Sequence, residues 1–402
     1  MSMFQSFITS ELHGTQLIEE YVPLCNKLLF ENPSTIRLVI DKLQKNIIDY
    51  ATKYSLSYKD FQHNRIYDRT QLSHNNWYVD QLIRENQIFH TSGSSSGQPF
   101  SYGVWNKYIS FLEDECHYGM ILDEFTIDKN KPKILMLKKL AYNPQHSEFL
   151  HKQKGPSPYT LHTHKSVDST RYFVKFDNYM TESDAWFDKV FEHTRHLMPF
   201  DIVMITGPIM SFLVRYLKKN SITIKIAKLM SQTGEFMRDT DKQYLIDNNY
   251  TEHVCDHMRC WDGGSSFFTC KYNTYHLLDN ISWTRQGPDN KLICTDYFNF
   301  SAPFINYWNG DLCEIKDEYQ LCACGRWYRP FKMLQNRPFA LKGPTKLTEI
   351  KEKISALDFK SSIDQVQFEN LTANVYLNNK LDDWCINKLK EILNDYEVKI
   401  YE

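Results

Sequence analysis

Residues Phe200 to Leu229, FDIVMITGPIMSFLVRYLKKNSITIKIAKL, carry the pattern that decides the fold. The apolar runs at 200–205 and 222–229 are typical of buried strands, and Met210 to Lys219 place apolar residues at helical spacing between them. The stretch therefore predicts a strand, a helix and a second strand. Units of this kind favour an α/β fold with a largely parallel sheet, whose ligands bind beyond the carboxyl ends of the strands.

Similar patterns extend on both sides of this unit. Residues 17–55 repeat apolar side chains at helical spacing, and residues 133–137 form another short apolar run. After Arg337 the pattern predicts a small αββαβ domain, with a helix at 347–357, strands at 365–368 and 373–377, a helix at 382–396 and a strand at 398–401. We expect two domains, residues 1–337 and 338–402, because Pro338, Gly343 and Pro344 interrupt both periodicities at their boundary.

The composition excludes several classes of protein. Lysine and arginine total 47 against 49 aspartate and glutamate, so no net charge attracts nucleic acid or an anionic membrane. The start, MSMFQSFITS, lacks the pattern of a signal peptide, and no stretch reaches the ~20 apolar residues of a membrane span. We expect a cytoplasmic protein, whose 10 cysteines are buried thiols or metal ligands rather than disulfides.

A loop rich in serine and glycine, HTSGSSSGQP, occupies residues 90–99. Its glycines would let the backbone approach a polyphosphate, and its hydroxyl and amide groups would surround it with donors. A flexible linker has the same composition, so both interpretations stay open. Gln98 and Pro99 replace the lysine and hydroxyl residue of a Walker-type loop, which disfavours that class. Residues 93–97 also fit the G-x-S-x-G elbow of hydrolases, in which Ser95 would be the nucleophile.

Further motifs follow this loop along the chain. They are Thr233-Gly234-Glu235, the segment 256–262 (DHMRCWD), residues 292–296 (LICTD) with 303–311 (PFINYWNGD), and Arg337. Together with the loop, and in this order, they resemble the motifs of the adenylate-forming enzymes, in particular the phenylacetate–CoA ligase and CapK-like branch. The resemblance covers roughly residues 20–402, so each match supports the others.

This resemblance implies ATP-dependent activation of a carboxylic acid, an aryl acid being one option, as an acyl adenylate. The acyl group would pass to a thiol of CoA or a carrier protein, to an amine or to a hydroxyl. Asp311 would accept hydrogen bonds from the ribose, Asp262 would help to hold Mg²⁺, and Arg337 would act at the domain hinge. The residues implied for ATP or AMP are Thr91, Ser92, Gly93, Ser94, Ser95, Ser96, Gly97, Gln98, Gly234, Glu235 and Asp311.

Two departures from the family pattern suggest an alternative. Gln98 stands where a lysine usually contacts phosphate, which removes a positive charge. No residue matches the adenylation lysine, which the family carries just beyond its last C-terminal strand, so the small domain is expected to be shortened. The alternative hypothesis is a degenerate member that binds nucleotide or acyl adenylate without efficient adenylation and acts with a partner protein.

Two cysteine-containing pairs predict a structural zinc site. Cys322-Ala323-Cys324-Gly325-Arg326 resembles a segment of the same branch, and Cys270 with His276 resembles its upstream ligand pair. Three thiolates and one imidazole are a common zinc ligand set, and four protein ligands make a structural site. A rival set within one short stretch is His253, Cys255, His257 and Cys260.

Overall fold

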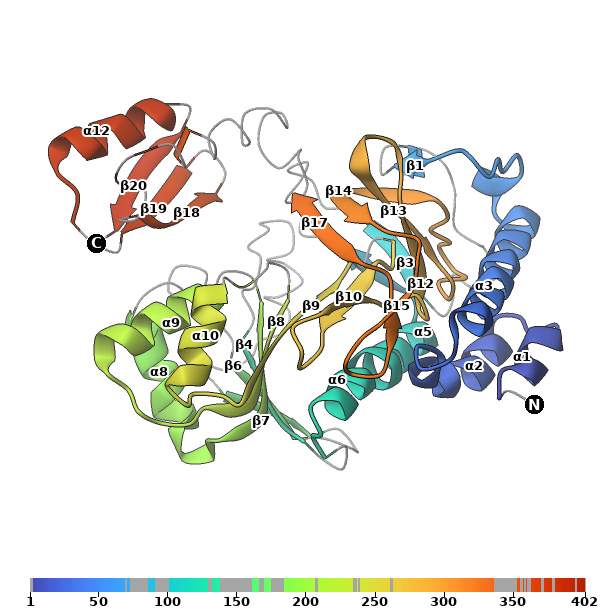
Figure 1. The fold of residues 1–402 in the computed structure, drawn as a ribbon, viewed down its shortest axis with the longest axis horizontal. Coiled ribbons are helices and arrows are strands. Elements are labelled where there is room, and N and C mark those ends of the chain that lie inside the picture. Colours follow the sequence, from blue (N-terminus) through green and yellow to red (C-terminus); the bar gives the residue numbers. More distant parts are fainter. Residues whose placement is uncertain are drawn as a thin grey trace. The chain divides into compact units, whose positions relative to one another are not determined.

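The computed structural model contains two compact units, and the chain changes from the first to the second between Leu334 and Gln335 (Figure 1). The predicted division after residue 337 stays a prediction, because residues 336–352 lie outside the described part. The structure describes residues 3–68, 71–72, 86–90, 101–128, 132–137, 161–165, 170–174, 184–206, 209–233, 237, 239–260, 263–335, 353–354, 357, 359, 363–369, 372–377, 380–394 and 396–401.

The larger unit contains an eight-stranded sheet of order β11-β10-β9-β8-β7-β4-β6-β5. Its parallel centre consists of β6 (Thr170–Val174), β4 (Lys133–Leu137), β7 (Phe200–Thr206), β8 (Ala227–Thr233) and β9 (His253–Arg259). Antiparallel strands complete both edges, namely β5 (Leu161–Lys165), β10 (Ser266–Thr269) and β11 (Tyr275–Leu277). The helices α8 (Asp184–Thr194), α9 (Ile209–Asn220) and α10 (Asp239–Asp247) gather on one side of this sheet (Figure 1). The α/β fold class predicted from the sequence is confirmed.

The second strand of the predicted unit begins later than expected. We predicted a strand at 222–229, whereas β8 runs from Ala227 to Thr233. Ala227 pairs with Phe200, the first residue of β7, and the preceding Pro199 has no amide hydrogen to extend the ladder. The Ile226 carbonyl accepts the last hydrogen bond from this end of β7, from the Phe200 amide at 2.8 Å, and residues 222–225 precede the ladder.

A second, five-stranded sheet shares its hydrophobic core with the N-terminal helices. It contains β1 (Tyr67–Asp68), β14 (Tyr307–Ile315), β13 (Lys291–Asp296), β12 (Ser282–Gln286) and β17 (Phe331–Gln335). The helices are α1 (Gln5–Thr9), α2 (Thr15–Leu28) and α3 (Pro33–Tyr54). Asn32 caps the start of α3, because its side chain accepts a hydrogen bond from the Thr35 amide at 3.0 Å. Its buried face repeats every three or four residues, through Ile36, Val39, Ile40, Leu43 and Ile47.

Shorter elements connect these sheets. A hairpin of β2 (Asn86–His90) and β3 (Ser101–Trp105) leads into α5 (Asn106–Phe111), a π-helical segment (Leu112–Tyr118) and α6 (Gly119–Glu124). A second hairpin, β15 (Gln320–Leu321) with β16 (Trp327–Tyr328), presents residues 322–326 in its turn. None of the helices among the described residues has the length and apolar character needed to cross a membrane.

The smaller unit has its own core. Its three-stranded sheet has the order β18 (Ile363–Glu369), β19 (Thr372–Leu377) and β20 (Glu397–Tyr401). In the sequence, α12 (Asp383–Ile392) lies between β19 and β20. Asp382 caps this helix by accepting a hydrogen bond from the Cys385 amide at 2.8 Å. Among its described residues, the buried side chains of this core are Ala373, Val375, Leu377, Leu381, Leu389 and Leu393.

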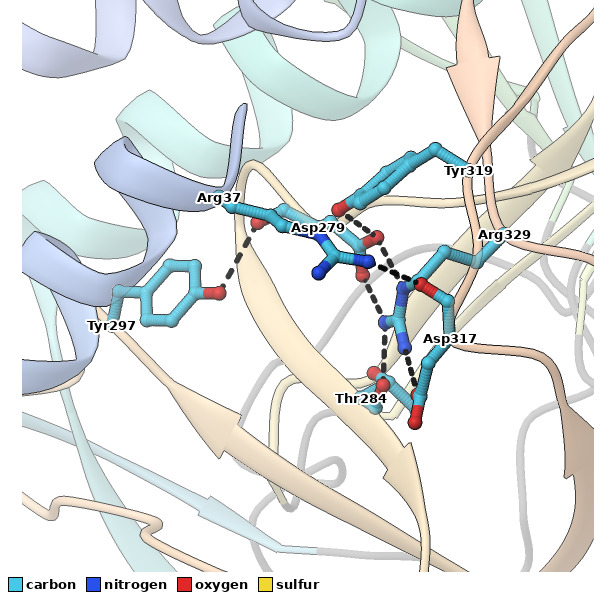
Figure 2. A network of polar contacts seen from close by, with 7 residues as sticks. All are labelled: Arg37, Asp279, Thr284, Tyr297, Asp317, Tyr319 and Arg329. Atoms are coloured by element: carbon cyan, nitrogen blue, oxygen red, sulfur yellow. Dashed lines mark hydrogen bonds and ion pairs between the residues drawn. The ribbon is translucent and has the colours of Figure 1, made fainter. Parts of the chain in front are cut away.

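A buried ion pair joins the β11–β12 connection to the chain before β17 (Figure 2). Arg329 donates from Nε to Asp279 at 2.8 Å and from one terminal nitrogen to the second carboxylate oxygen at 2.5 Å. Both side chains are essentially inaccessible to solvent. Burial disfavours the charge on Arg329, but Asp279 outweighs it, so the pKa of the guanidinium is raised. The Tyr319 hydroxyl donates to the same carboxylate at 2.9 Å, and Arg329 also donates to the Thr284 carbonyl.

Candidate functional site

Five of the sequence-predicted site residues are described, namely Asp311, Cys270, His276, Cys322 and Cys324. The remaining ones lie outside the described residues and stay predictions, namely Thr91, Ser92, Gly93, Ser94, Ser95, Ser96, Gly97, Gln98, Gly234, Glu235, Asp262 and Arg337. Two described strands lead toward some of them. β8 ends one residue before Gly234, and β9 ends three residues before Asp262. These positions follow the carboxyl ends of parallel strands, where open α/β sheets bind ligands.

Asp311 lies buried in β14 and is held on several sides. Its carboxylate accepts a hydrogen bond from the Asn309 side-chain amide at 2.9 Å, and its own amide donates back to Asn309 Oδ1 at 2.9 Å. The Cys260 thiol lies 3.7 Å from the same carboxylate and directly follows β9. Gly310, between Asn309 and Asp311, has a φ of 102°, which suits glycine. This irregular stretch of β14, where the pairing with β13 shifts register, thus holds one carboxylate beside Cys260 just after β9.

A second buried carboxylate, Asp296, ends β13. The Tyr108 hydroxyl donates a hydrogen bond to it, and the Phe298 amide donates another at 3.0 Å. Burial raises the pKa of the Asp296 carboxyl, while these hydrogen bonds and the nearby Arg259 favour its ionised form. Arg259 also lies over the Tyr108 ring, with 5.6 Å from its Cζ atom to the ring centroid.

Gly264 lies directly against this carboxylate. Its φ is +77°, and a Cβ atom added there would lie 2.6 Å from Asp296 Oδ2. We expect Gly264→Ala to lower the free energy of unfolding by about 1–3 kcal/mol, because it adds both backbone strain and a steric conflict. Urea unfolding would measure the loss. Gly14→Ala is the matched control, since Gly14 also has a positive φ but no atom within 4 Å of the added Cβ. Equal losses in the two variants would show that the contact with Asp296 has no effect.

His117, His257 and Ser231 form a histidine cluster that was not predicted from the sequence. The Ser231 hydroxyl and His257 Nδ1 are 2.5 Å apart, and the ring centroids of His117 and His257 are 5.0 Å apart. His117 belongs to the π-helical segment, whereas the other two residues lie on β9 and β8. Such a cluster has no signal in the sequence, because its members come from three separate elements and match no motif.

The structure brings Cys270, His276, Cys322 and Cys324 together, with one ligand atom of each lying within 4.8 Å of the others. Cys270 follows β10, His276 lies in β11, and the two remaining cysteines occupy the β15–β16 turn. A hydrogen bond from Cys270 lowers the pKa of the Cys324 thiol, and His276 lowers it further. The same contact raises the pKa of the Cys270 thiol.

The distances in this quartet fit a tetrahedral zinc ion. With Zn–S bonds of about 2.3 Å and Zn–N bonds of about 2.05 Å, tetrahedral angles place two sulfurs about 3.8 Å apart and a sulfur and a nitrogen about 3.5 Å apart. The observed distances are 3.8 Å between the sulfurs of Cys270 and Cys322, and 3.5 Å between Cys324 Sγ and His276 Nε2. The sulfur separation is far too long for a disulfide, and the four residues match the donor set of a structural site.

The rival quartet, His253, Cys255, His257 and Cys260, does not converge. His253, Cys255 and His257 occupy every second position of β9 and so lie on one face of the strand. Successive residues on one face lie roughly 6.5 Å apart. Among the described residues, the cluster of Cys270, His276, Cys322 and Cys324 is the one group of this kind. His257 instead contacts Ser231.

Comparison with protein-family models and with curated protein sequences finds no match. Solved structures do match. A 2-hydroxyisobutyryl-CoA ligase in the postadenylation state, in complex with R3-HIB-AMP, superposes with a TM-score of 0.59 at 12% identity, over 93% of this chain and 87% of that chain. The same ligase with 2-HIB-AMP and CoA gives 0.55 at 12% identity in the thioesterification state, over 93% and 87% of the two chains. In an open conformation it gives 0.54 at 11% identity, over 91% and 88%.

The superpositions show a shared fold. Because the identities are only 11–12%, they do not identify the substrate. The resemblance to the phenylacetate–CoA ligase branch stays a prediction. The match extends over most of both chains, so it concerns the architecture as a whole rather than a common sheet motif. The chain therefore shares the fold of this 2-hydroxyisobutyryl-CoA ligase.

Proposed function

We propose that this chain activates a carboxylic acid with ATP. One carboxylate oxygen attacks the α-phosphorus, the bond from that phosphorus to the bridging oxygen breaks, and pyrophosphate leaves an acyl adenylate behind. Positioning and charge neutralisation carry such a displacement. A thiol of CoA or of a carrier protein, an amine or a hydroxyl then takes the acyl group and releases AMP. The fold shared with acyl-CoA ligases supports this proposal.

The observation that carries the proposal is the fixed carboxylate of Asp311. Asn309 and Cys260 orient it, and its two oxygens are suited to accept hydrogen bonds from the two ribose hydroxyls of ATP. Because it lies beside the end of β9, it stands at the edge of the sheet where ligands of open α/β folds bind.

The other roles in this proposal rest on the sequence motifs. Ser94, Ser95, Ser96 and Gly97 hold phosphate, with Thr91, Ser92, Gly93 and Gln98 completing the loop. Gly234 and Glu235 flank the adenine. Asp262 helps to hold the Mg²⁺ that accompanies ATP, and Arg337 acts where the two domains join. The quartet of Cys270, His276, Cys322 and Cys324 holds a structural zinc ion, whose four protein ligands leave no position for substrate.

We expect Asp311→Ala to raise the KM for ATP about 10–100-fold, which corresponds to the loss of about one hydrogen bond to a charged group. Exchange of labelled pyrophosphate into ATP, with a panel of aryl, fatty and amino acids, would measure it. Asp289→Ala is the control, because Asp289 is an exposed carboxylate in the β12–β13 turn. An unchanged KM in Asp311→Ala would show that this carboxylate does not bind the nucleotide.

A second candidate function is binding without adenylation, and Gln98 in place of a lysine favours it. In that case ATP raises the melting temperature while no acid of the panel supports exchange. If ATP changes neither exchange nor melting, both candidates fail. Labelling of Ser95 by a fluorophosphonate would instead indicate a hydrolase.

A further inference from the structure

The residues of the histidine cluster, His117, His257 and Ser231, are polar side chains buried inside the larger unit. His117 is 4% exposed and His257 is 6% exposed, and their rings meet at 65°. His257 already shares a hydrogen with Ser231, whose hydroxyl is fully buried. Neither ring nitrogen of His117 has a hydrogen-bond partner among the described residues. Buried polar groups in folded proteins almost always form hydrogen bonds, so we expect a bound group to form one with the His117 imidazole.

The charge state of His117 defines what that partner must offer. Burial lowers the pKa of His117 well below its usual value, and the neighbouring His257 and Arg259 lower it further. The imidazole is therefore neutral at pH 7, with one nitrogen donating and the other accepting. The carboxylate of Asp296 lies close enough to Arg259 to balance its positive charge, so the partner of His117 need not be an anion. A hydroxyl, which both donates and accepts, fits best.

The backbone around His117 is an independent sign of a functional site. Residues Leu112 to Tyr118 form a π-helix between α5 and α6. Such segments are rare and frequently lie at functional sites, because their wider turn redirects side chains. His117 is the penultimate residue of this segment, and the segment turns its imidazole toward His257.

The position of the cluster in the sheet connects it to the proposed site. Ser231 and His257 lie two residues before the carboxyl ends of β8 and β9. Arg259 ends β9, and Cys260, next in the chain, contacts Asp311. The cluster and the proposed ribose carboxylate thus border the same end of β9, where an acid joined to the nucleotide would extend.

We propose that His117, supported by His257, binds a hydroxyl group on the acyl part of the acid, so that the substrate is a hydroxylated carboxylic acid. This inference rests on the proposed function. A site built to hydrogen-bond a substrate hydroxyl discriminates strongly against the analogue that lacks it, because the buried imidazole is then left unpaired. A bound water would satisfy the imidazole without any preference among acids, so the preference itself is the test.

Pyrophosphate exchange with pairs of acids that differ by one hydroxyl would decide. Suitable pairs are 3- and 4-hydroxybenzoate against benzoate, and 3-hydroxybutyrate against butyrate. We expect kcat/KM for one hydroxylated acid to exceed that of its partner by at least about 100-fold, and His117→Leu to reduce this ratio below about tenfold. His253→Leu is the control, since His253 begins β9, the strand that carries His257, but packs on Phe125. It should leave the ratio unchanged.

The outcomes separate this inference from the proposed function. Exchange that is equal or better with the unsubstituted acids overturns the inference and leaves the ligase proposal standing. Silence with every acid overturns both. The ratio in the unaltered chain is informative even if His117→Leu folds poorly, and His117→Asn, which keeps a donor and an acceptor, should retain part of the preference. A His117→Leu variant that folds and keeps the full ratio also overturns the inference.

Discussion

A Cys322→Ala variant is expected to purify without zinc and to lose about 5 kcal/mol or more of its free energy of unfolding. Structural zinc contributes roughly 10–16 kcal/mol of binding free energy in small zinc-dependent domains, and part of that is folding free energy. Here the metal would tie the β15–β16 turn to β11. Metal analysis of the purified protein and urea unfolding would measure the two effects.

Cys313→Ala is the matched control for this experiment, because Cys313 is a fully buried thiol outside the quartet. It should keep about one zinc ion per chain. A chelator should lower the melting temperature of the unaltered chain and of Cys313→Ala, but not that of Cys322→Ala. The prediction fails if Cys322→Ala retains zinc, or if the unaltered chain purifies metal-free and ignores the chelator.

An Asp279→Ala variant is expected to lose about 3–5 kcal/mol of its free energy of unfolding, since it leaves the guanidinium of Arg329 buried and unpaired. Arg329 also lies over the Trp283 ring, 3.8 Å from its centroid, so it has no easy route to water. Urea unfolding at neutral pH would measure the loss.

Asp317→Ala is the comparison for this network, because its carboxylate lies 3.7 Å from Arg329 but is 81% exposed (Figure 2). Its removal should cost less than about 1 kcal/mol. The double variant Asp279→Leu with Arg329→Met should recover much of the loss, since apolar residues often replace buried ion pairs at little cost. Similar losses for Asp279→Ala and Asp317→Ala would show that burial does not decide the strength of this pair.

Local patterns predicted the central elements of the fold because burial leaves a direct trace in the sequence. The apolar run at 133–137 is β4, and the helix predicted at 210–219 is α9 with one more residue at each end. Propensity gave no signal for β5, whose sequence LHTHK is polar because it is an edge strand. β8 begins later than predicted because Pro199, the residue before β7, limits how far β7 and β8 can pair.

In the candidate site, too, short motifs could be found in the sequence, whereas contacts between distant residues could not. The cysteine and histidine quartet could be anticipated, because two short motifs supply its four members. The hydrogen bonds of Asp311 to Cys260 and of Arg329 to Asp279 could not, because each joins residues that only the folded chain brings together. The same holds for His117 and His257, which share no motif and meet where the π-helical segment contacts β9.

The metal-ligand quartet and the Asp279–Arg329 pair join the same two stretches of chain, 270–279 and 322–329. An opening fluctuation that lifts one stretch from the other must break both connections, so their free energies act in a single step. The backbone amides of the two stretches should then exchange with solvent as one cooperative unit, protected together while the zinc ion is bound. Release of the ion would leave the Asp279–Arg329 pair as the remaining connection of the two, so we expect the amides of both stretches to exchange faster.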